Sequence, residues 1–348
     1  MSIATPRTLR TDSADHAYER VARSSNEQAA RLAQQLMQET QGDVLFSLAD
    51  RGRYSTDASI YQQMPIGVLV PTSSQDVVTA LDICRGMGVP LVPRGGGTSQ
   101  CGQTVGTGLV IDHSKHVRQI LHLDVEQRTV TVEPGMVLDH LNAALKPHGL
   151  WYPVDVSTSG QATLGGMAGN NSCGSRSIAY GNMVHNVLGA KAWLSDGELL
   201  DWGPMAQSHG RAERIGHFVR DLAQQLRPEI DAHWPRVLRR VAGYNLDVFH
   251  PVSERPYTED GSVNLAHLLV GSEGTLALTH SLTLRLSPLP RAKVLGVVNF
   301  PTFVQAMDAA QHIVKLGTAG ALSAVELVDR TMIDLAMQNP AFAPTMRS

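Results

Sequence analysis

Cysteine is scarce in this 348-residue chain, which contains only Cys84, Cys101 and Cys173. An odd number of widely spaced cysteines argues against a disulfide framework and favours a reducing compartment. The Cys-x-x-Cys and His-Glu-x-x-His patterns of common metal sites are also missing. His113 and His116 lie on a predicted polar turn, where we expect exposure to solvent rather than metal binding. The sequence therefore predicts no metal site.

Long apolar runs and excess positive charge are missing as well. No run approaches the roughly 20 apolar residues of a membrane-spanning helix, and residues 1–20 lack the apolar region of a secretory signal. The formal net charge is −3, which argues against a nucleic-acid partner. The small cluster Arg236, Arg239 and Arg240 is typical of a solvated helix face. We expect a cytoplasmic protein, with peripheral association with the inner membrane left open.

Helix and strand signals alternate along most of the chain, which predicts an α+β fold. The run Thr72–Ser74 supplies N-cap candidates for a helix that Gly86 and Gly88 end. Asp196-Gly197 is the best hairpin signal. Further helices are predicted at 15–41, 138–145, 211–226, 234–242, 302–316 and 330–337. Strands are predicted at 66–70, 89–92, 109–112, 119–123, 129–133, 187–194, 198–202, 267–270, 276–286, 294–300 and 322–328.

Three consecutive glycines stand in PRGGGTSQCGQ (93–103), directly after a predicted strand. Consecutive glycines lose much backbone entropy on folding, so a plain surface turn would be a wasteful use of them. Close approach of bare N–H groups to a bulky anion offsets that loss, and a flexible loop is the alternative. The loop is not a Walker A motif, because Gln103 stands where that motif needs Lys. It is not a Gly-x-Gly-x-x-Gly fingerprint either, because Gln100 breaks the pattern.

Two more glycine-rich segments follow, SGQATLGGMAGNNSCG (159–174) and GSEGT (271–275). With 93–103 they are called here the first, second and third glycine segments. Together they predict a long ligand that lies along the backbone of one large domain. A dinucleotide fits, because its pyrophosphate needs N–H donors and its rings need flat apolar walls. Ser, Thr and Asn within the segments supply further hydrogen-bond partners.

The stretches PRGGGTS, STSGQATLGGMAGNNSCGSRSIAYGN and VGSEGTLAL resemble, in order and spacing, the FAD-binding PCMH-type domain of the vanillyl-alcohol-oxidase flavoprotein superfamily. Within it the chain is similar to the FAD-linked D-2-hydroxyacid dehydrogenases of the D-lactate and D-2-hydroxyglutarate types. STDASIYQ (55–62) further resembles the branch that carries a C-terminal iron–sulfur region. The resemblance covers roughly residues 43–340. It implies an α+β protein, with an FAD-binding domain of two α+β subdomains followed by the start of an α+β cap domain.

The resemblance also implies which residues contact FAD. The pyrophosphate would be wrapped by backbone N–H groups of Arg94, Gly95, Gly96, Gly97, Thr98 and Ser99. The flavin and ribityl chain would be lined by Gly160, Thr163, Gly165, Gly166, Ala168, Asn171, Ser172 and Gly174. Tyr180 and Gly181 match the family's following Tyr-Gly, although Tyr180 could equally be a core aromatic. Glu273 and Gly274 would close over the cofactor.

Two departures from the family pattern matter. Some relatives tether FAD through a histidine after the glycine turn, where this chain has Thr98, and others use a cysteine where this chain has Ser159 and Gly160. We therefore expect non-covalent FAD, and we expect Cys173 to be a buried small side chain without a redox role. Relatives carry the substrate-binding arginine, metal-binding histidines and catalytic base in the cap, so we name no catalytic residue in this chain.

The resemblance divides the chain into an N-terminal extension with a helix (1–42), the FAD-binding domain (43–290) and the beginning of a substrate-binding cap (291–348). We expect the chain to be truncated inside the cap, with an iron–sulfur cluster only in a further C-terminal region. The implied activity is hydride transfer from a D-2-hydroxyacid to flavin N5, with a separate electron acceptor as partner. The alternatives are a sibling oxidase or reductase with another substrate, and a non-catalytic FAD-binding fragment.

Overall fold

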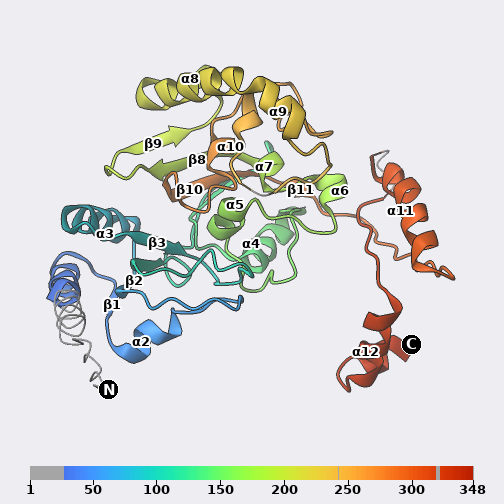
Figure 1. The fold of residues 1–348 in the computed structure, drawn as a ribbon, viewed down its shortest axis with the longest axis horizontal. Coiled ribbons are helices and arrows are strands. Elements are labelled where there is room, and N and C mark those ends of the chain that lie inside the picture. Colours follow the sequence, from blue (N-terminus) through green and yellow to red (C-terminus); the bar gives the residue numbers. More distant parts are fainter. Residues whose placement is uncertain (1–26, 242, 319–321, 348) are drawn as a thin grey trace, which may run out of the picture. The chain divides into compact units, whose positions relative to one another are not determined.

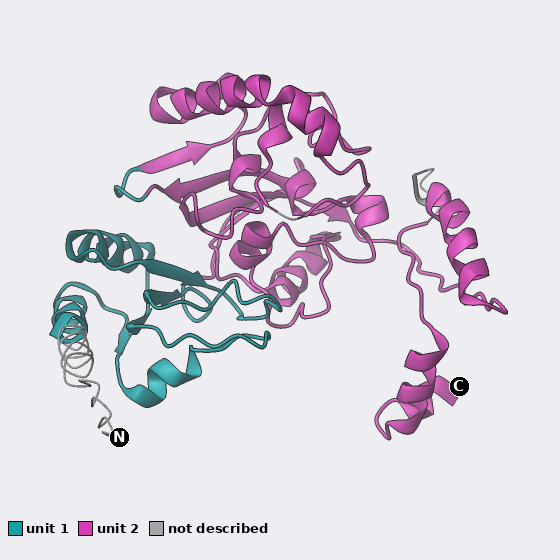
Figure 2. Ribbon diagram, in the orientation of Figure 1, with its two compact units in different colours: residues 1–117, 195–198 teal, residues 118–194, 199–348 magenta. Residues whose placement is uncertain are grey.

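The computed structural model describes residues 27–241, 243–318 and 322–347 of the chain. These residues divide into two compact units (Figure 2). Unit 1 contains residues 1–117 and 195–198, and unit 2 contains residues 118–194 and 199–348. Each unit is built around its own sheet, as expected for two α+β subdomains (Figure 1).

Unit 1 contains a four-stranded sheet with the order β1-β2-β4-β3. β1 (Asp43–Leu45) is antiparallel to β2 (Gly67–Val70), whereas β2, β4 (Leu109–Asp112) and β3 (Leu91–Arg94) are parallel. Every residue of β2 and β4 is buried, including the terminal Asp112 of β4, and the apolar runs of the two strands predict this burial for central parallel strands. The first glycine segment leaves the carboxyl end of β3, which is a common place for ligand sites.

The helices of unit 1 follow their local signals. α3 (Ser74–Met87) begins at the N-cap Ser73, whose Oγ accepts from the N–H of Asp76, and ends at Gly88 with φ +66°. This confirms the predicted boundaries, although Gly86 lies inside the helix. α2 (Leu48–Arg53) is a short additional helix. The helix predicted over 15–41 covers 27–39 in the structure, and residues 15–26 lie outside the described part.

Unit 2 contains a five-stranded antiparallel sheet with the order β5-β6-β10-β8-β9. The hairpin predicted at Asp196-Gly197 is confirmed, because it joins the paired strands β8 and β9. A separate two-stranded ladder pairs β7 with β11. The strands are β5 (Ile120–Asp124), β6 (Thr129–Val132), β7 (Leu150–Trp151), β8 (Val187–Trp193), β9 (Leu199–Trp202), β10 (Leu278–Arg285) and β11 (Ser287–Pro288).

Helices pack on this sheet: α5 lies against β10, α10 against β8, and α8 against β9. Apolar residues from the helices and loops of unit 2 share one core with the strands, including the fully buried Leu141, Leu164, Met183 and Leu265. The helices are α4 (Leu138–Leu145), α5 (Leu164–Asn170), α6 (Ser177–Tyr180), α7 (Met183–Asn186), α8 (Gly210–Gln225), α9 (Arg227–His233) and α10 (Ala266–Leu269).

Two predictions in unit 2 are wrong. The helix predicted over 234–242 is absent from its described residues, because α9 ends at His233 and Trp234 is extended at ψ 131° before Pro235. The strand predicted over 267–270 is the end of the buried helix α10. A short apolar run that is buried on all sides has no periodicity that could separate the two structures.

The C-terminal residues contain α11 (Phe303–Thr318), α12 (Arg330–Gln338) and α13 (Ala343–Arg347). The first two confirm the helices predicted there. The strands predicted over 294–300 and 322–328 are not formed, and in both ranges the described backbone is irregular. Val294 and Leu295 are 95% and 87% exposed. A strand needs a neighbouring strand to pair its backbone, and no described segment pairs with either range.

Candidate functional site

The side chain of Arg94 hydrogen-bonds to backbone carbonyls around the first glycine segment. Its Nη2 donates to the carbonyl of Thr56 (2.8 Å), its Nη1 donates to those of Tyr54 (3.3 Å) and Thr104 (3.4 Å), and its guanidinium stacks 5.3 Å from the centre of the Tyr54 ring. Burial lowers the pKa of Arg94 from its ordinary value. The side chain therefore ties residues 54–56 to the base of the loop, and it is held by carbonyl oxygens.

Gly97 and Gly102 allow this loop to pack closely on the segment 54–62. Gly97 has φ +64°, and a Cβ there would stand 2.6 Å from Nη2 of Arg94; its carbonyl accepts from the N–H of Ala58 (3.1 Å). Gly102 has φ +78°, and a Cβ would stand 2.7 Å from the Tyr61 ring. Within the described residues, no backbone hydrogen bond uses the N–H groups of residues 96–99.

In unit 2 the second glycine segment builds the start of α5. Thr163 is its N-cap, and the Oγ1 of Thr163 accepts from the N–H of Gly166 (3.3 Å). Gly165 packs on Pro134, where a Cβ would stand 2.6 Å from the proline Cβ. Gly160 lies in the preceding turn. Gly165 is thus required by packing, whereas Gly160 is exposed.

The end of α5 and the loop after it are shaped by two polar side chains. Asn171 is the C-cap at φ 55°, and its Oδ1 accepts from the N–H of Val184 (3.1 Å). Asp155 accepts from the hydroxyl of Ser175 (3.1 Å) and the N–H of Arg176 (3.2 Å). A Cβ at Gly174 would stand 2.3 Å from the Asp155 carboxylate. Asp155, which sequence reasoning missed, therefore folds this loop.

The structure brings the second and third glycine segments together. The N–H of Gly271 donates to the carbonyl of Ala168 (2.9 Å), and the N–H of Glu273 donates to that of Gly169 (3.0 Å). Asn170 Nδ2 donates to Glu273 Oε1 (3.0 Å). Glu273 holds a left-handed backbone at φ 52°, which is unfavourable for a residue with a Cβ. The first glycine segment belongs to the other unit.

Tyr180 ends α6 and packs its ring edge-on to Trp151, with 5.4 Å between ring centres. It remains half-buried, so both readings of Tyr180 stay open. Gly181 has φ +75°, and a Cβ would stand 2.9 Å from the His185 side chain. The guanidinium of Arg255 donates to the carbonyls of Ser177, Ile178 and Ala179 and so caps α6.

Cys173 and His113 test two of the sequence interpretations. Cys173 is a half-buried free thiol, and burial raises its pKa, which favours the protonated form. The expectation of a solvated His113 is wrong: its side chain is buried, and burial lowers its pKa to about 4. Within the part of the chain that the structure describes, no group of three His, Cys, Asp or Glu side chains could hold a metal ion.

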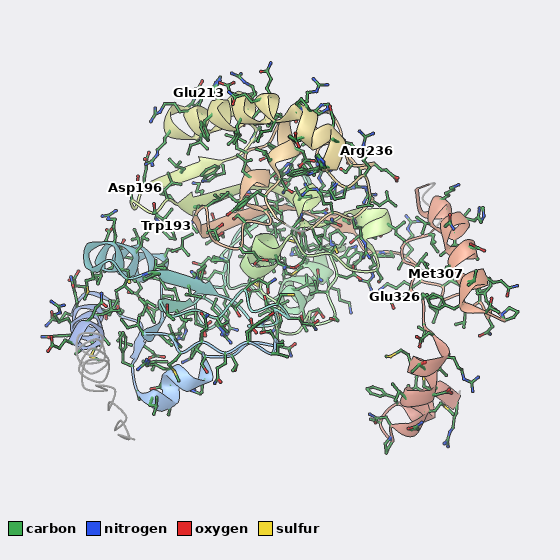
Figure 3. The ribbon with its side chains drawn as sticks, viewed as in Figure 1. Trp193, Asp196, Glu213, Arg236, Met307 and Glu326 are labelled. Atoms are coloured by element: carbon green, nitrogen blue, oxygen red, sulfur yellow. The ribbon has the colours of Figure 1, made fainter. Side chains whose placement is uncertain are left out.

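A buried polar network in unit 2 was missed altogether. The guanidinium of Arg240 pairs with Asp247 (Nη2 to Oδ1, 2.9 Å) and donates to Asn245 Oδ1 (2.8 Å) and the Tyr257 hydroxyl. Arg236, labelled in Figure 3, and Arg239 of the predicted arginine cluster are exposed as expected, although they do not lie on a helix. Arg236 donates to the carbonyl of Asp231, and Arg239 donates to that of Gly174 (3.0 Å). The order Arg-x₄-Asn-x-Asp was the available signal, but it has no periodicity to distinguish it from a polar loop.

Two protein-family models match the chain. "FAD binding domain" matches residues 65–203, and "FAD linked oxidases, C-terminal domain" matches residues 289–346. In solved structures, the fold matches alkyldihydroxyacetonephosphate synthase with TM-scores of 0.54 and 0.55, over 78% of this chain and 43% and 46% of those chains. At 19% and 18% identity this likeness concerns the fold alone. Fold and glycine segments together define a flavoprotein with a PCMH-type FAD-binding domain.

Similar curated proteins narrow the class. The D-2-hydroxyglutarate dehydrogenases of Pantoea ananatis and Escherichia coli are 37% and 36% identical over 86% of this chain and 29% of their own length. A probable mitochondrial D-lactate dehydrogenase of Danio rerio is 31% identical over 82% of this chain and 48% of its own. The chain therefore contains an FAD-binding domain and a matched part of the C-terminal domain of FAD-linked oxidases, and it is similar to D-2-hydroxyacid dehydrogenases. It spans about 30% of the length of the D-2-hydroxyglutarate dehydrogenases that it matches. No helix among the described residues has the length and apolar character needed to cross a membrane.

Proposed function

We propose that this chain binds FAD without a covalent bond and forms part of a dehydrogenase that oxidises a D-2-hydroxyacid. The observation that carries the proposal is the pairing of the second and third glycine segments through Gly271, Glu273 and Asn170. Two segments that resemble flavin-binding motifs, and that are distant in sequence, form one backbone surface. That convergence is what a cofactor site in unit 2 requires.

The first glycine segment fits a pyrophosphate. Its N–H groups at residues 96–99 make no backbone hydrogen bond within the described chain, so they can donate to phosphate oxygens. Because the Arg94 side chain is held by three carbonyls, we assign Arg94 to shaping the loop and assign phosphate binding to the backbone. The proposed contacts in this segment are Gly95, Gly96, Gly97, Thr98 and Ser99.

In unit 2 we propose two kinds of flavin-site residue. Gly165, Asn171 and Gly174 shape the backbone through packing and capping. The remaining candidates face the ligand by backbone or side chain: Gly160, Thr163, Gly166, Ala168, Ser172, Tyr180, Gly181, Glu273 and Gly274. Thr98 and Ser159 offer no group that forms the histidyl or cysteinyl flavin bonds of some relatives, so the cofactor is held by non-covalent contacts.

The names of the relatives suggest the substrate. Bound FAD supplies the acceptor for the hydride that leaves C2 of the hydroxyacid. D-2-hydroxyglutarate and D-lactate are the two candidates, because the similar curated proteins carry those names. We assign residues 43–290 to FAD binding and residues 291–348 to substrate binding, and we assign no catalytic base.

The proposal is tested with the purified 348-residue chain. It should show a flavin absorbance spectrum, and acid precipitation should leave the flavin in the supernatant. Anaerobic addition of D-2-hydroxyglutarate or D-lactate, each against its L-isomer, tests the substrate assignment through bleaching of the flavin band. A chain that binds no FAD would contradict the proposal entirely. Flavin that stays with the precipitate would contradict only non-covalent binding, and reduction by neither D-isomer would favour a sibling substrate or a purely FAD-binding role.

A further inference from the structure

The ion pair between Arg240 and Asp247 is buried, with 7% and 0% of the two side chains exposed. Removing two charges from water is costly, and such a pair is often no more stabilising than apolar residues of the same size. Asp247 Oδ2 has no hydrogen-bond partner among the described residues. Stability alone therefore gives little reason for this pair, and its geometry points to another role.

Asn245 connects the pair to the third glycine segment. Its side chain is fully buried, its Oδ1 accepts from Arg240 (2.8 Å), and its Nδ2 donates to the carbonyls of His267 (2.8 Å) and Val270 (2.9 Å). If the side-chain amide of Asn245 were flipped, its NH₂ group would face the guanidinium of Arg240, and two hydrogen-bond donors would then meet. Arg240 and the two carbonyls together fix the orientation of Asn245, and Asn245 holds the carbonyl directly before the Gly271 turn.

Backbone carbonyls next to the buried ion pair also contact the second and third glycine segments. The carbonyl of Arg240 accepts from Asn171 Nδ2 (3.5 Å) at the C-cap of α5. The carbonyl of Gly243 stands 2.9 Å from the position that a Cβ on Gly271 would take. With the bond from Gly271 to Ala168, these contacts form a closed ring that joins both glycine segments to the buried pair.

We propose that Arg240, Asn245 and Asp247 are positioning residues that hold the second and third glycine segments in the geometry that binds flavin. This inference rests on the proposed FAD site of unit 2. The buried charge supplies orientation, because rotation of the guanidinium would take Nη2 away from the buried oxygens of Asn245 and Asp247 and leave them without this donor. An apolar core of equal volume would keep the fold but would leave the buried Oδ1 of Asn245 without its arginine donor.

The test replaces the ion pair by apolar side chains of similar size, in Arg240→Met/Asp247→Leu. Such replacements often preserve stability, so the thermal midpoint of the apo chain should stay close to that of the wild type. The Kd for FAD should rise at least tenfold, and the visible absorbance bands of bound FAD should change shape. The matched control is Glu259→Gln/Arg285→Gln, which removes an exposed ion pair of unit 2 (2.8 Å) and should leave Kd and spectrum unchanged.

A double variant that folds and binds FAD with the wild-type Kd and spectrum would overturn the inference while leaving the proposed function intact. Hydrogen exchange on the wild-type chain gives a second test that needs no variant. FAD should slow exchange at Gly271 and Glu273 together with residues 243–247. Protection of the glycine segments alone would also overturn the inference. A wild-type chain without FAD affinity would instead overturn the proposed function, and the inference with it.

Discussion

Asn170 donates its side-chain N–H to the carboxylate of Glu273 across 3.0 Å, although the two residues are 103 positions apart. Asn170 is the last residue of α5, and Glu273 is the left-handed residue of the third glycine segment. The bond joins two segments that each resemble a flavin-binding motif. Because Glu273 combines an unfavourable backbone with a specific contact, its two roles can be separated by substitution.

Glu273→Gly and Glu273→Ala both remove the carboxylate, but only glycine tolerates φ 52° without cost. We expect Glu273→Gly to be more stable than Glu273→Ala by about 1 kcal/mol. FAD affinity should fall by a similar factor in both variants, because both lose the contact with Asn170. Denaturant unfolding and FAD titration measure the two effects. If the two variants were equally stable, the backbone of Glu273 would not be strained. If both kept the FAD affinity of the wild type, the contact between Asn170 and Glu273 would have no role in FAD binding.

Gly97→Ala should weaken FAD binding and destabilise unit 1. The new Cβ would stand 2.6 Å from Nη2 of Arg94 and would also strain a backbone at φ +64°. The matched control is Gly88→Ala, which has the same strain at φ +66° but no atom within 4 Å of the new Cβ. Strain alone costs about 1 kcal/mol, so a larger loss in Gly97→Ala measures the displacement of Arg94. Equal losses of stability in Gly97→Ala and Gly88→Ala would show that the Arg94 side chain moves away from the new Cβ without cost.

Acid should unfold the protein through its buried histidines. Burial lowers the pKa of His113, His185 and His267 to about 4, whereas histidines of the unfolded chain take up a proton near pH 6.5. This contribution to stability is complete above pH 6.5 and is lost as the pH falls towards 4. Each histidine then lowers the unfolding free energy by about 1.4 kcal/mol per pH unit.

His267→Gln should therefore flatten the pH dependence of the unfolding free energy between about pH 6.5 and 4. A glutamine there can still donate to the carbonyl of Val187, which His267 Nε2 contacts at 3.2 Å. The control is the same substitution at the exposed His116, and the slope of His267→Gln should be the flatter of the two. Denaturant unfolding at several pH values measures both slopes. Identical slopes for His267→Gln and the wild type would show that His267 titrates normally in the folded protein.

The exposed apolar segment near Val294 should promote self-association. Val294, Leu295, Val297 and Val298 are 95%, 87%, 77% and 65% exposed, and contiguous apolar surface of this kind drives aggregation. Replacing all four by serine should shift sedimentation velocity towards a single monomeric species. Ile60→Ser changes one residue of equal exposure, 95%, in unit 1 and should have little effect. A wild-type chain that is already monomeric at high concentration would contradict this prediction.

Local sequence signals located most elements because their causes are local. α3 needs only its Ser73 cap, its apolar stripe and Gly88, and the hairpin at Asp196-Gly197 needs only a turn between two alternating strands. The strands predicted over 294–300 and 322–328 failed for the opposite reason, since a strand exists only where a partner strand pairs with it. Apolar alternation is a necessary condition for that pairing but not a sufficient one.

The sequence by itself determined the α+β class, the glycine segments and the resemblance to an FAD-binding domain, because glycine runs and hydrophobic periodicity are read along the chain. Only the tertiary structure decided that Arg94 holds carbonyls, that Glu273 meets Asn170, and that Arg240 is buried against Asp247. Each of these contacts joins residues whose neighbours in sequence carry no sign of the partner. Burial and long-range pairing arise when the chain closes its core, so the local pattern does not contain them.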